Sequence, residues 1–143
     1  MIVIANPNAP TGMTIPVWQI EEIVKSNPDS LVLIDEAYID FGGETCLPLI
    51  AKYDNLLVTR TFSKSHALAG MRIGYAIGAP RLIAALKRIR DSFNSYPLDR
   101  IAQAAAEAAI LDTAYTAQTV QLVCQARDRC RERLLEAGIP CLK

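Results

Sequence analysis

The chain has 143 residues, about one domain, and 51% of them are hydrophobic, which is enough for a buried core. Fifteen basic and fifteen acidic side chains cancel, so no overall field attracts nucleic acid or an anionic membrane, and we expect neither as a partner. No apolar stretch approaches the roughly 20 residues that a membrane-spanning helix requires.

Short apolar segments alternate with turns and one helix in the first half of the chain. The segment Ile2–Ala5 predicts a strand that ends at a turn rich in asparagine and proline. A helix is expected from Pro16 to Lys25, because proline is favoured in a first turn and the apolar residues that follow share one face. Three further strands are expected at Leu31–Ile34, from Leu56 to near Thr61, and at Ile73–Ile77.

The alternation predicts an α/β fold, in which a three-layer arrangement places helices on both faces of a sheet. The segment Leu31–Ile34 is apolar throughout, which is typical of a strand buried on both faces. About ten residues, Ser63 to Gly70, join the third and fourth strands, and a parallel crossover usually takes a dozen or more. We therefore expect a mostly parallel sheet with one antiparallel strand, the fourth.

The second half of the chain is predicted to be helical. Helices are expected at about 81–90, 100–111 and 114–137, and the apolar residues from Gly138 to Lys143 suggest the start of another strand. Both ends of the chain therefore lie within predicted structure, where a complete domain usually has loose polar termini. We expect the chain to be part of a longer enzyme.

Cysteine and histidine usage gives no sign of a metal site. The four cysteines show no C-x-x-C spacing and His66 is the single histidine, so we expect no metal. Scattered free thiols suit a reducing cytoplasm, although four cysteines are enough for two pairs.

Polar side chains gather where the predicted strands end. They lie in Asn6–Gly12, Asp35–Tyr38 and Thr61–Lys64, and Arg72 follows closely. Ligands of open α/β sheets bind beyond the carboxyl ends of the strands, so these groups are candidates for one crevice. Taken singly, each has an ordinary explanation: Asp35 as the cap of a turn, Tyr38 as a core residue, and Lys64 as a surface lysine.

Four motifs in register resemble the fold-type I aminotransferases across nearly the whole chain. A further run, Phe93–Leu98, resembles the histidinol-phosphate aminotransferase branch of that family. The resemblance implies part of an aspartate aminotransferase-like large domain that binds pyridoxal 5'-phosphate. The motifs are Asn6-Pro7-Asn8-Ala9-Pro10-Thr11-Gly12, Asp35-Glu36-Ala37-Tyr38, Thr61-Phe62-Ser63-Lys64 and Leu68-Ala69-Gly70-Met71-Arg72-Ile73-Gly74-Tyr75.

The resemblance also implies a role for each polar residue. Lys64 is expected to form the Schiff base with the cofactor and then to move the proton, which requires a partly desolvated amine. Asp35 is expected to pair with the pyridine nitrogen, and Tyr38 to donate to the phenolic oxygen of the cofactor. Ser63 and Arg72 are expected to hold the phosphate, Arg72 through its bidentate guanidinium.

One position departs from the family pattern. The residue before Pro10-Thr11-Gly12 is commonly an asparagine that bonds the phenolic oxygen, and here it is Ala9. No role therefore carries over to Ala9. Asn8 is adjacent and is a candidate for the missing donor. If it does not reach, a larger share of the interaction falls to Tyr38.

The implied activity transfers an amino group from histidinol phosphate to 2-oxoglutarate, a step of histidine biosynthesis. The family works as a homodimer, and we expect the enzyme to be cytoplasmic. The implied organisation places residues 1–112 in the large domain, and residues 113–143 in a connecting helix and the start of a small domain. Without the rest of that domain, we expect the isolated chain to be inactive. Three alternatives share these motifs and are not excluded by the sequence: an aromatic aminotransferase, a phosphothreonine decarboxylase and a non-catalytic domain of an aminotransferase-like regulator.

Three other features have no role in these motifs. His66 is interpreted as a loop residue, since a lysine already transfers the proton in this chemistry. Arg60 is interpreted as a solvated or paired arginine. The mixed-sign run Arg127–Arg133 predicts a solvated helix face with i,i+4 ion pairs.

Overall fold

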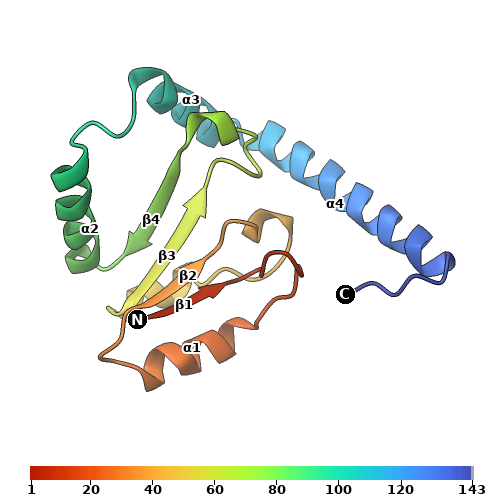
Figure 1. The fold of residues 1–143 in the computed structure, drawn as a ribbon, viewed down its shortest axis with the longest axis horizontal. Coiled ribbons are helices and arrows are strands. Elements are labelled where there is room, and N and C mark those ends of the chain that lie inside the picture. The colour runs from red at the N-terminus through yellow and green to blue at the C-terminus, as the bar shows by residue number, and fades with distance from the viewer. Residues whose placement is uncertain (143) are drawn as a thin grey trace.

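The computed structural model describes residues 1–142, which fold around a sheet of four strands in sequential order (Figure 1). The strands are β1 (Ile2–Ala5), β2 (Val32–Asp35), β3 (Leu56–Thr61) and β4 (Gly74–Gly78). β2 pairs in parallel with β1 and with β3, whereas β4 pairs antiparallel with β3. The predicted mixed sheet is therefore confirmed, including its antiparallel fourth strand.

The α-helices are α1 (Val17–Ser26), α2 (Pro80–Phe93), α3 (Arg100–Leu111) and α4 (Thr113–Glu136). Each begins within one residue of its predicted start. The second continues to Phe93 instead of ending at Arg90, and the amide of Asn94 closes its last turn on the Arg90 carbonyl. The 3-10 helices are η1 (Ile39–Phe41), η2 (Leu47–Ala51) and η3 (Ala69–Met71). They were not predicted because they are too short to show a hydrophobic period.

The main core lies between α1 and one face of the sheet. Alternate residues of β2 and β3 point to this face, as the two-residue period of a strand requires. On the other face, Leu57 is 2% exposed but Val3 is 58% exposed, so β1 is covered on one side only within residues 1–142. The buried core residues are Ile20, Val24, Val32, Ile34, Cys46, Leu49, Leu56 and Val58.

A second, smaller core anchors α3 beyond the end of β3. Phe62 and Ile73 are buried there against Ala102 of α3, with Tyr75 packed alongside. Phe62 directly follows β3 and its ring lies 5.6 Å from the ring of Tyr75. This packing fixes the backbone on either side of Ser63 and Lys64.

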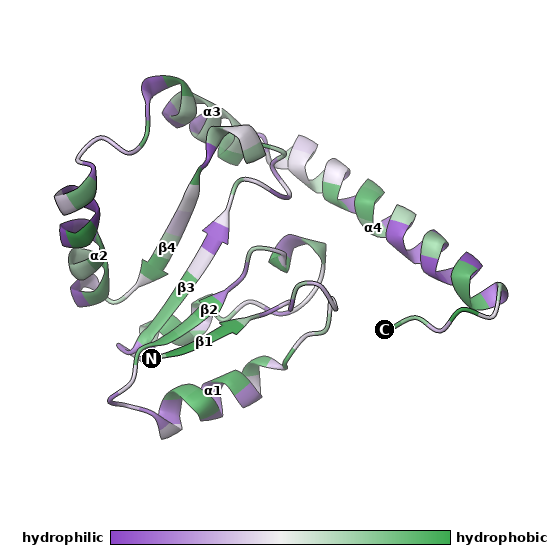
Figure 2. Cartoon of the chain, viewed as in Figure 1, coloured by the Kyte–Doolittle hydropathy of each residue, from purple (hydrophilic) through white to green (hydrophobic). Residues whose placement is uncertain are grey.

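The helix α4 extends away from the sheet (Figure 1), and hydrophobic and hydrophilic residues are mixed along its length (Figure 2). Asp112 caps its first turn by accepting from the Tyr115 amide. The strand predicted from Gly138 is wrong for residues 138–142, which form a turn and an irregular segment. A strand needs a partner for its backbone groups, and no strand of the described chain lies beside them. Lys143 lies outside the described residues. Within residues 1–142, no helix is long and apolar enough to cross a membrane.

We predict that Cys46 of the folded protein resists thiol reagents while Cys130 reacts. Both are free thiols, Cys46 buried and Cys130 exposed. Burial raises the pKa of Cys46 to about 12, with a further contribution from the charge of Glu36. Only thiolate is nucleophilic, so at pH 8 the reactive fraction of Cys46 is about a thousandfold below that of an ordinary thiol. Mass spectrometry after brief alkylation checks this; modification of both residues at equal rates would contradict it.

Candidate active site

Asp35 and Lys64 lie beyond the same edge of the sheet, as the sequence predicted. β2 and β3 run in parallel, with Asp35 paired in register with Thr59. Lys64 follows the end of β3 by three residues, so both side chains belong to the carboxyl edge of these strands. This is the edge at which open α/β sheets bind ligands.

Arg72 comes back to this edge because β4 is antiparallel to β3. The carbonyl of its neighbour Ile73 accepts hydrogen bonds from the Phe62 amide at 3.1 Å and from Thr61 Oγ1 at 3.3 Å. Arg72 therefore lies across from Ser63 along the backbone. Its guanidinium is exposed and donates from Nη1 to the Ala69 carbonyl at 2.9 Å.

A cavity of about 940 Å³ brings together four of the predicted site residues, Asn8, Tyr38, Ser63 and Lys64. It is also lined by the loop of residues 7–12, by Phe41 to Gly43 and by α4. Asp35 and Arg72 are not among its lining residues. The crevice expected from the sequence is thus assembled in part: Arg72 lies at the same sheet edge but does not line this cavity.

Lys64 and Tyr38 are in direct contact within the cavity. The Lys64 Nζ lies 5.0 Å from the centroid of the Tyr38 ring, within the range of a cation–π interaction. Tyr38 is half-buried, but Lys64 is exposed. The partly desolvated amine expected from the sequence is not found within residues 1–142, where Lys64 is exposed.

Asp35 has one oxygen committed and one uncommitted. Its Oδ1 accepts from the Ala37 amide at 3.1 Å and from Thr59 Oγ1 at 3.3 Å. The bond to Ala37 is the turn cap considered as the alternative for this residue. Within the described chain Oδ2 accepts no hydrogen bond, so it is available to pair with a protonated ring nitrogen. The two interpretations of Asp35 are therefore compatible.

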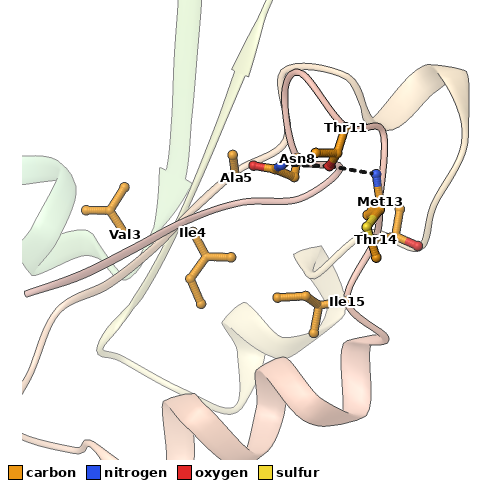
Figure 3. Close-up of a pocket in the computed structure, with 8 residues that line it drawn as sticks. All are labelled: Val3, Ile4, Ala5, Asn8, Thr11, Met13, Thr14 and Ile15. Atoms are coloured by element: carbon orange, nitrogen blue, oxygen red, sulfur yellow. Dashed lines mark hydrogen bonds between the residues drawn. The ribbon is translucent and has the colours of Figure 1, made fainter. Parts of the chain in front are cut away.

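Asn8 is used inside its own loop. Its Nδ2 donates to Thr11 Oγ1 at 2.7 Å, and the same Thr11 oxygen accepts from the Met13 amide at 3.3 Å (Figure 3). These bonds border a second cavity of about 440 Å³ beside β1. One hydrogen of the Asn8 amide nitrogen is thus engaged by Thr11, which holds this side chain in its own loop and leaves the second hydrogen for another acceptor.

A buried ion pair behind the site was not predicted from the sequence. Glu36 is 1% exposed and accepts from Arg60 Nε at 3.0 Å and Nη2 at 2.8 Å. Its other bonds come from Thr45 Oγ1 and from the Cys46 amide at 2.6 Å. Burial lowers the pKa of Arg60, but its hydrogen bond to Glu36 and the charge of that group outweigh burial, so the net shift is upward. Of the two interpretations of Arg60, the paired arginine is confirmed.

Ser65 joins the Lys64 loop to η1. Its hydroxyl is 4% exposed and donates to Asp40 Oδ2. His66 Nδ1 lies 3.0 Å from the same hydroxyl, and its ring packs 4.8 Å from that of Phe62. These contacts agree with the interpretation of His66 as a loop residue. Asp40 and Ser65 lie far apart in the sequence, so no local pattern indicated this link.

Arg127–Arg133 is largely a solvated face, as predicted, with the side chains of Arg127 and Asp128 55% and 59% exposed. Arg127, Asp128 and Arg131 line the large cavity, and Arg127 Nη1 donates to the Phe41 carbonyl at 2.8 Å. The ion pair found is between the adjacent residues Arg127 and Asp128, not between i and i+4. This hydrogen-bonded pair raises the pKa of Arg127 and lowers that of Asp128. The contact with Phe41 was not predicted, because η1 approaches α4 from a distant part of the chain.

The family model of the class I and II aminotransferases matches residues 1–143. The chain belongs to this family. A curated histidinol-phosphate aminotransferase of Lactococcus lactis subsp. cremoris is 54% identical over 137 residues, 96% of this chain and 38% of the relative. Another, of Gluconacetobacter diazotrophicus, is 56% identical over 126 residues, 88% of this chain and 35% of the relative.

The fold of this aminotransferase chain matches solved structures of the family. A histidinol-phosphate aminotransferase from Sinorhizobium meliloti, in complex with pyridoxal-5'-phosphate, superposes with a TM-score of 0.85 at 31% identity. The match covers 97% of this chain and 39% of that one. The chain therefore spans about two fifths of the length of such relatives, and the activity of a whole protein is a matter for proposal.

The functional groups at the sheet edge match in kind the groups of pyridoxal phosphate. A primary amine and a phenol are in contact at Lys64 and Tyr38. A carboxylate oxygen of Asp35 is uncommitted, and Ser63 and Arg72 supply a hydroxyl and a guanidinium. An aldehyde, a phenolic oxygen, a ring nitrogen and a phosphate are the complementary groups of the cofactor.

Proposed function

We propose that this chain is the cofactor-binding core of a histidinol-phosphate:2-oxoglutarate aminotransferase that uses pyridoxal phosphate. The observation that carries the proposal is the contact between Lys64 and the Tyr38 ring in a cavity shared with Ser63, at the carboxyl edge of β2 and β3. The substrate is proposed from curated relatives above 50% identity, among them the two described above, which are named histidinol-phosphate aminotransferases.

Each residue acts at a stated atom in this proposal. Lys64 Nζ would hold the cofactor at its aldehyde carbon, and this amine would carry the proton that moves in the reaction. Asp35 Oδ2 accepts from the ring nitrogen and keeps it protonated. Tyr38 donates from its hydroxyl to the phenolic oxygen, and Ser63 and Arg72 hold the phosphate. The bound cofactor supplies the electron sink for the reaction.

The arrangement of the whole enzyme is also part of the proposal. Residues 1–112 form part of a large domain, and α4 leads from it toward a small domain that holds the substrate. We propose a homodimer that takes an amino donor and a 2-oxo acid. The four free thiols suit a reducing compartment, so we place the enzyme in the cytoplasm.

The substrate assignment is tested by assaying the full-length protein with several amino donors. We expect histidinol phosphate with 2-oxoglutarate to give the highest kcat/KM, at least tenfold above phenylalanine, tyrosine and aspartate, because pocket contacts of about 1.4 kcal/mol distinguish substrates tenfold. Highest activity with an aromatic amino acid would make it an aromatic aminotransferase. Release of carbon dioxide from phosphothreonine would make it a decarboxylase.

Replacing Ala9 is expected to compensate for the loss of the Tyr38 hydroxyl. Tyr38→Phe removes a hydrogen bond to a charged oxygen, worth about 1.5–3 kcal/mol, and Ala9→Asn offers a second donor in its place. We expect Tyr38→Phe to raise the pH at which the absorbance of the bound cofactor changes, and Ala9→Asn to lower it and to restore part of the loss in the double variant. Spectrophotometric titration of all four proteins measures this. A midpoint that Ala9→Asn leaves unchanged in both backgrounds would show that another group already occupies the position of the missing donor.

A further inference from the structure

The 3-10 helix η1 is attached to two parts of the site at once. On one side, Asp40 accepts from the buried hydroxyl of Ser65, the residue next to Lys64. On the other side, the Phe41 carbonyl faces α4 (Thr113–Glu136). Tyr38 directly precedes η1, and its carbonyl accepts from the Phe41 amide at 3.1 Å. The turn that carries Tyr38 is therefore held between the lysine loop and the long helix.

Arg127 makes the strongest contact from α4 to this turn. Its Nη1 donates to the Phe41 carbonyl at 2.8 Å, whereas Cys124 Sγ, one turn earlier, reaches the same oxygen at 3.4 Å as a weak donor. Arg127 Nε donates to Asp128 Oδ1 at 2.8 Å, which fixes the plane of the guanidinium. A Cβ added at Gly42 would lie 3.9 Å from Arg127 Nη1, so the guanidinium rests against this glycine.

We propose that Arg127 is a positioning residue for the active site, acting through the Phe41 carbonyl to set the place of Tyr38 relative to Lys64. The inference rests on the proposed function, because it gives the Tyr38 hydroxyl and the Lys64 amine their tasks. Arg127 needs no contact with cofactor or substrate for this role. It makes α4 part of the active site, although the helix contributes none of the family motifs.

The physical reason is the precision that the site requires. Catalytic groups must be held within about 0.5 Å of their productive positions by neighbours that are themselves fixed. Tyr38 is only half-buried, so packing alone does not fix it. Its ring centroid lies 5.0 Å from Lys64 Nζ. The Asp40–Ser65 and Phe41–Arg127 bonds hold adjacent residues of η1, which follows Tyr38 directly. Releasing the Phe41 end frees Tyr38 to move with η1.

The same contacts distinguish a positioning role of Arg127 from a direct effect of its charge on the site. Charged side chains around the Tyr38 cavity are Lys64 from the loop after β3, and Arg127, Asp128 and Arg131 from α4; Asp40 lies on η1 itself. Arg127 is paired with Asp128, so its charge is largely offset locally. A lysine at position 127 keeps the charge and a donor but has no bidentate plane.

The test uses the full-length protein saturated with pyridoxal phosphate and compares Arg127→Met, Arg127→Lys and Arg129→Met with the wild type. Arg129 lies on the same helix, is exposed, and has no side-chain hydrogen bond within the described chain, so it is the matched control. The readout is the pH midpoint at which the absorbance of the bound cofactor changes. A purely structural role lowers the melting temperature but leaves this midpoint in place.

We expect Arg127→Met to raise the midpoint by about half a unit to one unit, since a displaced Tyr38 donates less well to the phenolic oxygen. Arg127→Lys should recover at least half of the shift, and Arg129→Met should match the wild type. Hydrogen exchange of the Phe41 and Gly42 amides in the apoenzyme should quicken about tenfold in Arg127→Met alone, which corresponds to about 1.4 kcal/mol.

An unchanged midpoint in Arg127→Met would overturn the inference while leaving the proposed function intact. A wild-type protein that binds no cofactor at Lys64 would overturn both. Where Arg127→Met does not fold, Arg127→Gln takes its place, because glutamine is shorter and its amide falls short of the Phe41 carbonyl. A wild-type midpoint in that variant would equally contradict a positioning role.

Discussion

Lys64→Ala in the full-length protein is expected to abolish transamination. Loss of a positioned acid–base group alone costs roughly 10²–10⁴-fold in rate, and Lys64 is also the proposed covalent anchor of the cofactor. The contact of its amine with the Tyr38 ring places it in the cavity with Ser63. Steady-state kinetics with histidinol phosphate and 2-oxoglutarate should therefore show a decrease in kcat at or beyond the upper end of this range.

The control for this variant is Lys87→Ala, because Lys87 is an exposed lysine on α2 with no part in the site. It should keep the wild-type kcat. Circular dichroism should show that both variants are folded. If Lys64→Ala kept a tenth or more of the wild-type activity, another lysine would carry the cofactor and the proposed site would be wrong.

Arg60→Met is expected to give the largest loss of stability. Glu36 is 1% exposed, and without Arg60 its carboxylate stays buried with only neutral donors, Thr45 and the Cys46 amide. Breaking a buried pair in this way costs about 3–5 kcal/mol. Denaturant titration should show a corresponding decrease in the free energy of unfolding. The exposed Arg81→Met is the control and should change it by less than about 0.5 kcal/mol.

The double variant Glu36→Leu/Arg60→Met distinguishes two causes of the lost stability: the loss of the ion pair itself, and the burial of an unpaired Glu36 carboxylate. Replacing both members of a buried pair by apolar residues is often neutral or stabilising, so this protein should be more stable than Arg60→Met alone. If the double variant were the less stable of the two, the ion pair itself would stabilise the fold, and the unpaired buried carboxylate would not explain the loss in Arg60→Met.

The order of elements could be predicted because each depends on local signals. Short apolar runs ending in turns gave β1 to β3, and the brief connection after β3 gave the antiparallel β4. The rule that ligands bind beyond the carboxyl ends of the strands then predicted that Asp35 and Lys64 lie at one edge of the sheet. The direction of β4 relative to β3 depends on the length of the segment that joins them, which can be counted in the sequence.

Contacts between distant segments could not be predicted in the same way. Glu36 and Arg60 are separated by 24 positions, and Phe41 and Arg127 by 86, so no period links them. An arginine on a helix of mixed polarity has the same pattern whether it faces solvent or another backbone. The strand expected from Gly138 failed for a related reason, since strand formation depends on a partner elsewhere.

The solvent exposure of the site side chains could not be predicted from sequence patterns either. The chemistry assigned to Lys64 suggested a partly desolvated amine, yet the side chain is exposed within residues 1–142. Arg72 returns to the site edge, but its guanidinium is turned to the Ala69 carbonyl instead of the cavity. Motifs identify the residue types at a site, whereas their solvent cover depends on every segment that surrounds them.

The central claim is that Lys64 holds pyridoxal phosphate, and borohydride reduction tests it most directly. The full-length protein is incubated with the cofactor, reduced, digested and mapped by mass spectrometry. We expect one reduced phosphopyridoxyl group, on the peptide that contains Ser63 and Lys64, and none in Lys64→Ala. A reduced cofactor on a different lysine, or no adduct in the wild-type protein, would contradict it.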